Sequence, residues 1–338
     1  MHTPQLALTG HRGQVTLDEL TLEPPPAGHV QVKITHSGIS TGTELLTLDT
    51  HLESDLQFRM GYQAAGVVAS AGEGMADTYK PGDRVACYGG PYVYHASHIN
   101  VPRHLLTPMP DNVDDRHAAF CGLSSVALHG FRHTGCHIGE TVAVIGLGLL
   151  GNLAAQCARA AGCRVITSEL LPRRVEAARG AGLEVAGSLD ELTFRVAALT
   201  EGKGADAVMI GVKNADDFML RKAFELVRRL GKVVILGLAD GALPRDVMFA
   251  KEATVMVTRA AGWGRYEAPY ERDGVDLHYE HARWTEHRNL VEVIRQMSVG
   301  GLRIGSLLTD EFAAEDAAQA YEALRNNPAE HLGVTIRW

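Results

Sequence analysis

The chain has 338 residues, of which 46% are hydrophobic and 21% are charged, and it carries a net charge of −8. This composition is typical of a globular enzyme of about two domains, and the negative charge argues against binding to nucleic acid or an anionic membrane. No apolar run reaches the roughly 18 residues of a membrane span, and the N-terminus lacks the basic and then apolar order of a signal peptide. The five cysteines are scattered without a Cys-x-x-Cys pair, so we expect a reducing cytoplasm and neither a disulfide framework nor a structural zinc site.

The first 120 residues predict a β-rich domain. Residues 29–36 (HVQVKITH) alternate apolar and polar side chains, which is typical of a half-buried strand. A turn is expected at Pro81-Gly82-Asp83. Residues 114–133 then favour a helix, and further short strands are expected at 66–69, 84–87, 98–102 and 105–109.

The stretch at 141–162 (TVAVIGLGLLGNLAAQCARAAG) organises the second half of the chain. Residues 142–145 form an apolar run of the kind that makes a strand buried on both faces. Residues 152–161 are rich in Ala, Leu and Gln, which favour helix. The sequence therefore predicts a buried strand, a glycine-rich turn and a helix in direct succession.

Gly146, Gly148 and Gly151 have Gly-x-Gly-x-x-Gly spacing in that turn. The first glycine permits the tight turn, the second lets a pyrophosphate approach the backbone, and the third lets the helix pack closely on the strand. The helix opens at Leu149 and Leu150, whose backbone N–H groups are expected to bind the phosphates. Because the flanking strand and helix are both present, the motif predicts a dinucleotide site.

Glu169 ends the next predicted strand, residues 164–168, and lies eighteen residues past Gly151. An acidic side chain at this point accepts hydrogen bonds from ribose hydroxyls and repels the 2′-phosphate of NADP, so NAD is the predicted cofactor. Arg174, just behind Glu169 in the sequence, is a further candidate contact that could soften this preference.

Strands and helices alternate from this point on, which predicts a parallel, doubly wound α/β sheet with its ligand crevice at the carboxyl ends of the strands. Gly211, Gly237 and Leu238 follow strands at that edge and are candidate cofactor contacts. The expected helices are 172–180, 189–200 and 215–230, and the expected strands are 207–210 and 232–236.

Residues 262–284 are aromatic and charged, and they predict a long loop of the kind that is often functional. Arg265, Tyr266, Arg283 and Trp284 are candidate substrate contacts, because aromatic rings beside arginines suit sugar binding. The alternative is a contact within a homodimer, which is the expected assembly. The chain is expected to close with helices at 289–297 and 316–324 and a strand at 332–338.

Several pieces of the sequence together resemble the medium-chain dehydrogenase/reductase superfamily, of the alcohol and polyol dehydrogenase type, over essentially the whole chain. The resemblance implies a GroES-like β-rich catalytic domain at 1–121 and 263–338 and a Rossmann dinucleotide-binding domain at 122–262. The pieces are SGISTGTEL at 37–45, GYQAAGVV at 61–68, PGDRV at 81–85, SSVALHG at 124–130, GLGLLG at 146–151 and the terminal strand.

The likeness breaks at the positions that bind catalytic zinc in the resembled enzymes. Those enzymes read Gly-Ile-Cys-Gly-Thr-Asp where residues 38–44 read GISTGTE, so Ser40 replaces the cysteine. They read Gly-His-Glu where this chain has Gly61-Tyr62-Gln63, and only Cys121 lies near a third ligand position. Since catalytic zinc needs three Cys, His or carboxylate ligands, no metal is predicted.

The same comparison suggests the catalytic groups. Thr43 matches the hydroxyl of the resembled proton relay, Tyr62 replaces the lost histidine, and Glu44 matches an aspartate that supports the ligand shell. Ser40 and His95 are candidate substrate contacts. The structural alternatives are that Tyr62 fills the space of the metal and that Glu44 is a buried carboxylate bound to backbone N–H groups.

The segment from Arg265 to Asn289 resembles a zinc-less branch that includes sugar-oxidising enzymes. The predicted function is therefore a zinc-independent, NAD(H)-dependent interconversion of a secondary hydroxyl and a ketone on a sugar, glycoside or cyclitol. The alternatives are a zinc-less NAD(P)H quinone or enoyl reductase, a tetrapyrrole side-chain dehydrogenase and a non-catalytic nucleotide sensor.

Overall fold

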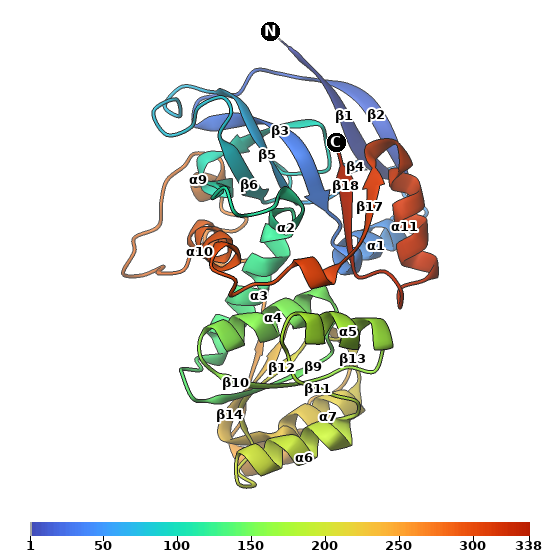
Figure 1. The fold of residues 1–338 in the computed structure, drawn as a ribbon, viewed down its shortest axis with the longest axis vertical. Helices are drawn as coiled ribbons and strands as arrows, with labels where there is room; N and C mark the ends of the chain where they lie inside the picture. The colour runs from blue at the N-terminus through green and yellow to red at the C-terminus, as the bar shows by residue number, and fades with distance from the viewer. Residues whose placement is uncertain (1) are drawn as a thin grey trace. The chain divides into compact units, whose positions relative to one another are not determined.

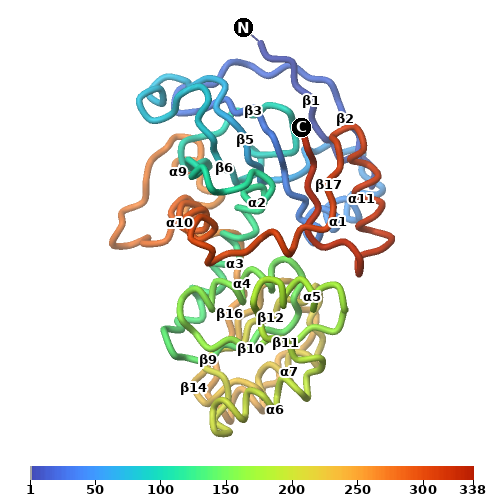
Figure 2. Tube along the Cα trace, viewed as in Figure 1, coloured from blue at the N-terminus to red at the C-terminus, as the bar shows by residue number. Residues whose placement is uncertain are grey.

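The computed structural model describes residues 2–338, and the chain divides into two compact units. The first unit contains the residues up to Ser125, Gly262–Ser298 and Leu308–Trp338, and the second contains Val126–Ala261 and Val299–Leu307. Both ends of the chain lie in the first unit, where the N-terminal strands and the C-terminal segment run side by side (Figure 2). No helix among the described residues has the length and apolar character needed to cross a membrane.

Two sheets frame the first unit. The larger follows the order β17-β18-β3-β5-β6-β8, with β7 also paired to β3, and the smaller follows the order β2-β1-β4. The strands are β1 (Thr3–His11), β2 (Gln14–Leu22), β3 (His29–Gly38), β4 (Phe58–Arg59), β5 (Gln63–Ala71), β6 (Arg84–Tyr88), β7 (His98–Pro102), β8 (Leu106–Pro108), β17 (Leu308–Ala313) and β18 (Gly333–Arg337).

The first unit also contains several helices and two 3-10 turns. One of them, α3, contains the boundary between the two units. The helices are α1 (Thr41–Thr50), α2 (Asp115–Ala118), α3 (Cys121–Thr134), α9 (Ala268–Glu271), α10 (Glu286–Ser298) and α11 (Ala317–Asn326), with 3-10 turns η1 (Arg103–Leu105) and η3 (Ala314–Asp316).

The alternating sequence of β3 explains how the larger sheet is buried. Val30, Val32 and Ile34 point into one apolar cluster with Val68 and Val85 of the neighbouring strands. Burying side chains of this size stabilises the fold by about 1.5–3 kcal/mol each.

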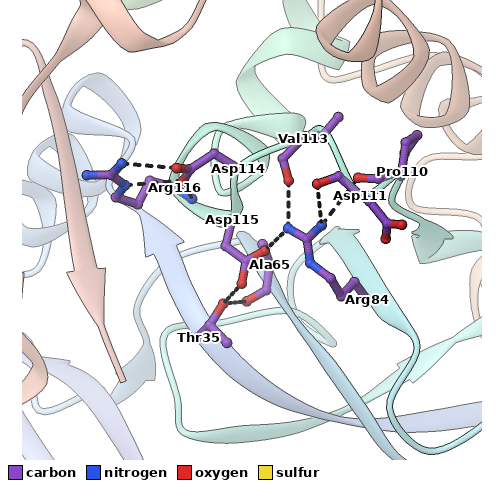
Figure 3. Close-up of polar contacts among 9 residues, drawn as sticks. All are labelled: Thr35, Ala65, Arg84, Pro110, Asp111, Val113, Asp114, Asp115 and Arg116. Atoms are coloured by element: carbon purple, nitrogen blue, oxygen red, sulfur yellow. Dashed lines mark hydrogen bonds and ion pairs between the residues drawn. The ribbon is translucent and has the colours of Figure 1, made fainter.

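A polar bridge fastens α2 to this sheet (Figure 3). Arg84 of β6 pairs with Asp115 and donates a hydrogen bond to the carbonyl oxygen of Val113 at 2.6 Å. The hydroxyl of Thr35 of β3 lies 2.8 Å from the Asp115 carboxylate and 3.2 Å from the carbonyl oxygen of Ala65, so its single proton is available to either acceptor. The bridge fixes where the chain leaves the sheet on its way to α3.

Six parallel strands form the sheet of the second unit, in the order β11-β10-β9-β12-β14-β16. Successive strands run outward from β9 in one direction and from β12 in the other, which is a doubly wound sheet with its switch point between β9 and β12. Helices α4 and α5 lie on one face of the sheet, and α6 and α7 lie on the other (Figure 1). The predicted α/β fold class is confirmed.

The elements of this unit alternate along the chain as the sequence indicated. They are β9 (Thr141–Ile145), α4 (Leu149–Ala160), β10 (Arg164–Ser168), α5 (Pro172–Gly180), β11 (Val185–Ala186), α6 (Leu189–Leu199), β12 (Ala205–Ile210), β13 (Asn214–Ala215), α7 (Asp217–Leu226), β14 (Val227–Ile235), β15 (Leu238–Ala239), α8 (Arg245–Lys251), β16 (Thr254–Val257) and η2 (Gly305–Leu307).

Of the predicted bounds that differ from the structure, three matter most for the architecture. The helix expected at 215–230 ends at Leu226, because Val227 pairs with Ala205 and begins β14. The helix expected at 114–133 is interrupted between α2 and α3. Residues 299–307 belong to the second unit, where the N–H of Arg303 donates to Gln156 of α4 at 2.6 Å, although the sequence placed them in the first domain.

Candidate active site

The glycine-rich turn lies at the switch point of the doubly wound sheet. Gly146 follows β9 with a φ of 86°, and a Cβ at Gly151 would lie 2.0 Å from the carbonyl oxygen of Gly146. A Cβ at Gly211, which follows β12, would lie 2.7 Å from the Cα of Gly151. The three glycines therefore let α4 begin in direct contact with the ends of β9 and β12.

Gly148 stands where a phosphate would approach. It is the N-cap of α4 and supplies no capping side chain, so the first N–H groups of the helix, which include those of Leu149 and Leu150, lack a cap hydrogen bond. A Cβ at Gly148 would meet nothing nearer than the Arg174 guanidinium at 3.9 Å. Open space, helix N–H groups and a nearby arginine fit the pyrophosphate of a nicotinamide dinucleotide.

Glu169 is buried at the end of β10 and touches the glycine-rich turn. Its carboxylate accepts hydrogen bonds from the N–H groups of Leu147 and Leu170, both at 2.8 Å, and from that of Leu171 at 3.1 Å. Arg174 lies 4.0 Å away. The carboxylate is thus fixed at the point where the motif places the adenosine ribose.

The other two candidate cofactor residues lie beyond β14. A Cβ at Gly237 would lie 2.6 Å from the carbonyl oxygen of Val212, so glycine allows the chain to cross close to the segment after β12. Leu238 opens the short strand β15, which pairs with β13, and its side chain is exposed.

In the first unit, Glu44 of α1 is the centre of a buried hydrogen-bond network. Its carboxylate accepts from the N–H of Ser40 at 2.7 Å and from the hydroxyl of Tyr321 at 2.5 Å, and it contacts Nε2 of His95 at 3.1 Å. His95 Nδ1 in turn contacts the hydroxyl of Ser37 at 2.7 Å. Three chain segments, around Ser40, His95 and Tyr321, are fixed by one carboxylate, which is the arrangement expected of a structural acid.

His95 lies inside this network. The side chain is fully buried and both ring nitrogens have partners. The sequence treated His95 as a substrate contact, but this geometry makes it a positioning residue, because the ring offers no atom to a bound molecule.

Tyr62 and Ser40 form the hydroxyl pair nearest to this network. The phenol of Tyr62 donates to Oγ of Ser40 at 2.6 Å, and the exposed Thr43 of α1 lies beside them. Burial of the phenol, with the nearby Glu44 carboxylate, raises the pKa of Tyr62 above its ordinary value. Tyr62 is therefore protonated at neutral pH and can donate a hydrogen bond or a proton to a substrate oxygen.

The positions that match zinc ligands do not fit a zinc ion. Ser40 bonds to Tyr62, and Gln63 donates to the carbonyl oxygen of Gly38 at 3.1 Å and accepts from the N–H of Leu123 at 2.8 Å. Cys121 is buried, its thiol donates to the carbonyl oxygen of Cys87 at 3.2 Å, and desolvation raises the pKa of the thiol to about 12. Among residues 2–338, no three His, Cys, Asp or Glu side chains are grouped to hold a metal.

An aromatic and charged cluster from the 262–286 segment lies beside Tyr62. The ring of Tyr88 is 5.8 Å from that of Tyr62, and the Arg265 guanidinium lies 5.8 Å from the centre of the Tyr88 ring. The guanidinium also lies 4.0 Å from the centre of the Tyr266 ring. Thus the structure brings together Tyr62, Ser40, Thr43, Arg265 and Tyr266 in one unit.

Arg265 is held by two buried carboxylates. It pairs with Glu271, donates to the carbonyl oxygen of Gly90 at 2.6 Å, and lies 3.8 Å from Glu286. Burial, together with the neighbouring Glu271, raises the pKa of Glu286 to about 9. Glu286 is thus a neutral acid at pH 7, which limits the excess negative charge in the cluster.

Arg283 and Trp284 lie elsewhere on the same segment. The Arg283 guanidinium is 5.2 Å from the centre of the Trp284 ring, and Trp284 is partly buried. The role of this pair as a substrate contact stays a prediction.

The raised pKa of Glu286 predicts how stability changes with pH. Glu286 binds a proton up to about pH 9 in the folded state, but only up to about pH 4.5 in the unfolded chain. Its contribution to the free energy of unfolding is therefore full below pH 4.5 and is lost as the pH rises to 9. The slope is about 1.4 kcal/mol per pH unit. Relative to Glu286→Gln, the wild type should therefore lose about 3 kcal/mol of unfolding free energy between pH 5 and pH 7.

Urea unfolding followed by tryptophan fluorescence measures this effect, because Trp263, Trp284 and Trp338 all lie in the first unit. Glu280→Gln removes an exposed carboxylate of the same segment and should follow the wild type. Parallel pH curves for wild type and Glu286→Gln would contradict a protonated Glu286.

The sequence missed four members of the site: Tyr88, Glu271, Glu286 and Tyr321. Glu271 lies in the predicted polar loop, Glu286 lies between that loop and the helix predicted at 289–297, and Tyr321 lies 277 residues from its partner Glu44. A signal existed only for Tyr88, which follows a predicted strand and precedes two glycines.

The known proteins to which this chain is similar are dehydrogenases and other oxidoreductases. The family model described as zinc-binding dehydrogenase matches residues 150–272. A sorbitol dehydrogenase of Halalkalibacterium halodurans is 25% identical, covering 91% of this chain and 92% of its own length. A probable quinone oxidoreductase of Schizosaccharomyces pombe is 29% identical, covering 65% and 66% respectively. The structure of galactitol-1-phosphate dehydrogenase from Escherichia coli matches with a TM-score of 0.78 at 20% identity, covering 98% of this chain and 100% of its own, which shows a shared fold.

Proposed function

The chain belongs to the medium-chain dehydrogenase/reductase superfamily, a family of oxidoreductases that use nicotinamide cofactors, and from this premise we propose its reaction. We propose that it interconverts a secondary hydroxyl and a ketone on a sugar, glycoside or cyclitol, with NAD(H) and without a catalytic zinc. The sorbitol dehydrogenase relative supports the polyol class of substrate. The observation that carries the proposal is the Tyr62–Ser40 hydroxyl pair, which stands where zinc ligands would be needed.

The glycine-rich turn and Glu169 of the second unit would hold the dinucleotide. When bound, the nicotinamide supplies a hydride acceptor or donor. In the reductive direction, Tyr62 donates its phenolic proton to the oxygen of the ketone as the carbon receives the hydride. Ser40, which accepts from Tyr62 at 2.6 Å, and the exposed Thr43 then relay a proton from solvent to the phenolate, which restores the phenol.

We further propose that NAD is preferred over NADP. The Glu169 carboxylate would repel a 2′-phosphate, and Arg174 at 4.0 Å offsets only part of that charge. The kcat/KM of the wild type should be at least about 10-fold higher with NAD than with NADP. Glu169→Gln should lower this NAD-to-NADP ratio by about 10-fold, or about 1.4 kcal/mol. Glu176→Gln, on the exposed side of α5, is the control and should keep the ratio. An unchanged ratio in Glu169→Gln would remove Glu169 from cofactor selection.

The second candidate is a zinc-less NAD(P)H quinone or enoyl reductase. It is favoured by the quinone oxidoreductase relative and by Arg174, which could receive a 2′-phosphate. The polar cluster around Arg265 favours the polyol reaction instead, since quinones and enones bind to apolar walls.

We also propose a cytoplasmic homodimer. Strand β16 is the edge of the second unit's sheet, and Val257 on it is 65% exposed. An exposed apolar edge strand is suited to pairing with a second copy, and the molar mass from light scattering decides between one and two chains.

The activity test is absorbance at the NADH band with purified protein, NAD and a panel of polyols, sugars and glycosides. Growth of the band with any member of the panel supports the proposal and identifies the substrate class. A flat trace with every member, together with NADPH consumption in the presence of quinones or enones, would establish the reductase instead.

A further inference from the structure

Tyr266 is an exposed aromatic ring on a rigid support. Its side chain is 57% exposed, and the Arg265 guanidinium lies 4.0 Å from the ring centre. The guanidinium cannot move away, because it also pairs with Glu271 and donates to the carbonyl oxygen of Gly90. A ring held on a fixed cation loses little conformational entropy when a ligand stacks on it.

The backbone of Tyr266 is fixed as well. Its φ of 69° lies in the left-handed region, which costs a non-glycine residue on the order of 1 kcal/mol or more. The N–H of Tyr266 donates to the Glu271 carboxylate at 2.9 Å, so one buried acid holds both Arg265 and Tyr266 in place. Strain that is maintained by two interactions of one carboxylate is typical of a ligand-binding position.

The charge around this ring is unsuited to an anion. Residues 262–298 contain five arginines, seven carboxylates and no lysine. Four of the arginines pair with carboxylates of the same segment, and Arg283 lies over Trp284. The pairs are Arg265–Glu271, Arg272–Asp273, Arg288–Asp276 and Arg295–Glu292. A phosphate or carboxylate near Tyr266 would meet Glu271 and a guanidinium whose charge is already balanced.

We propose that Tyr266, supported by Arg265 and Glu271, is the subsite that selects an uncharged, ring-shaped sugar or cyclitol over its phosphorylated and open-chain counterparts. The apolar face of a pyranose or cyclitol ring stacks on the phenol ring, which an open-chain polyol does not match in shape. The buried Glu271 carboxylate, which already accepts from Arg265 and Tyr266, disfavours the anionic analogues. This inference rests on the proposed function for the reaction at Tyr62, which lies in the same cluster as Tyr266.

Binding to the full-length protein tests the subsite without turnover. The probes are methyl β-glucoside, glucose 6-phosphate and sorbitol, measured by saturation-transfer NMR and calorimetry. Wild type should bind the glucoside at least 10-fold more tightly than either other probe. Tyr266→Ala should lose about 10-fold in glucoside affinity, whereas Tyr266→Phe, which keeps the ring, should retain it.

The chain offers a matched control for the ring. Tyr279 is also 57% exposed, and its ring lies 5.2 Å from the guanidinium of Arg288, which is paired with Asp276. Tyr279→Ala should leave glucoside binding unchanged. Equal losses in Tyr266→Ala and Tyr279→Ala, or tighter binding of glucose 6-phosphate than of the glucoside by wild type, would overturn the proposal.

A second pair of variants tests the exclusion of anions. Glu271→Gln should narrow the gap between glucoside and glucose 6-phosphate by about 10-fold, and Asp276→Asn should not. The exclusion of anions would be contradicted if the ratio of glucoside to glucose 6-phosphate affinity stayed unchanged in Glu271→Gln while Tyr266→Phe still bound the glucoside.

Two results distinguish the Tyr266 subsite from the proposed reaction. NADH formation with sorbitol and ring sugars at equal efficiency would overturn the subsite and leave the dehydrogenase standing. Glucoside binding that depends on Tyr266 but leads to no NADH formation would support the subsite and remove the proposed reaction.

Discussion

Tyr62→Phe should lower the rate of ketone reduction by about 10²–10⁴-fold, because it removes the only phenolic proton beside Ser40 and leaves the ring in place. The affinity for the cofactor should not change, since the dinucleotide motif lies in the second unit. The raised pKa of the phenol adds a pH dependence. Alcohol oxidation requires the deprotonated phenol, so its rate in the wild type should rise steadily from pH 7 to pH 10, and the residual rate of Tyr62→Phe should not follow that rise.

Steady-state kinetics in both directions, with cofactor Kd from fluorescence, measure these effects. Tyr79→Phe is the matched control, because Tyr79 is a buried tyrosine of the same unit whose hydroxyl contacts only the carbonyl oxygen of Leu106. If Tyr62→Phe kept wild-type turnover, Tyr62 would be a space-filling residue and the proton would have another donor.

Gly151→Ala should reduce cofactor affinity by about 100-fold and the unfolding free energy of the second unit by about 3 kcal/mol. Alanine normally favours a helix over glycine by about 1 kcal/mol, and Gly151 lies inside α4. The added Cβ would nevertheless lie 2.0 Å from the carbonyl oxygen of Gly146, so α4 must move away from β9 and from the phosphate position.

Calorimetric titration with NAD and circular dichroism during urea unfolding check both effects. Gly187→Ala is the control in the same unit, since its Cβ would meet only the Glu191 side chain at 3.5 Å. Wild-type cofactor affinity in Gly151→Ala would show that the dinucleotide does not bind at this turn.

The sequence predicted the second unit in detail because its signals are local. The order of apolar run, spaced glycines, helix and acid is contained within 29 residues, from Thr141 to Glu169, and each part forms the expected element. The parallel strands also follow from this alternation, since a buried βαβ unit has essentially one way to wind.

The first unit was less predictable because its contacts are distant in sequence. The helix α1 was not expected, since Gly42 and four threonines disfavour a helix over residues 41–50, yet burial of Leu45 and Leu48 against α11 stabilises it. Glu44 could be identified as a buried acid, but its partners Tyr321 and His95 come from residues 277 and 51 positions away.

The contacts around Arg265 and Tyr266 were also hard to predict, because they join residues that are distant in the sequence. Arg265 and Tyr266 stand out as neighbours in the sequence, and the structure brings them to Tyr88 and Tyr62. Glu286 lies before the helix predicted at 289–297, whereas the structure places it in the first turn of α10. Only the packing of α9 and α10 shows that it is buried beside Arg265.

The most direct test of the central claim is turnover of chelator-treated protein whose zinc content has been measured, with NAD and a ring-shaped polyol that the wild type oxidises. We expect full activity at far less than one zinc per chain and no gain when zinc is added, since Ser40, Tyr62 and Gln63 replace the ligands. A rate that rises in proportion to bound zinc would contradict a reaction carried by Tyr62.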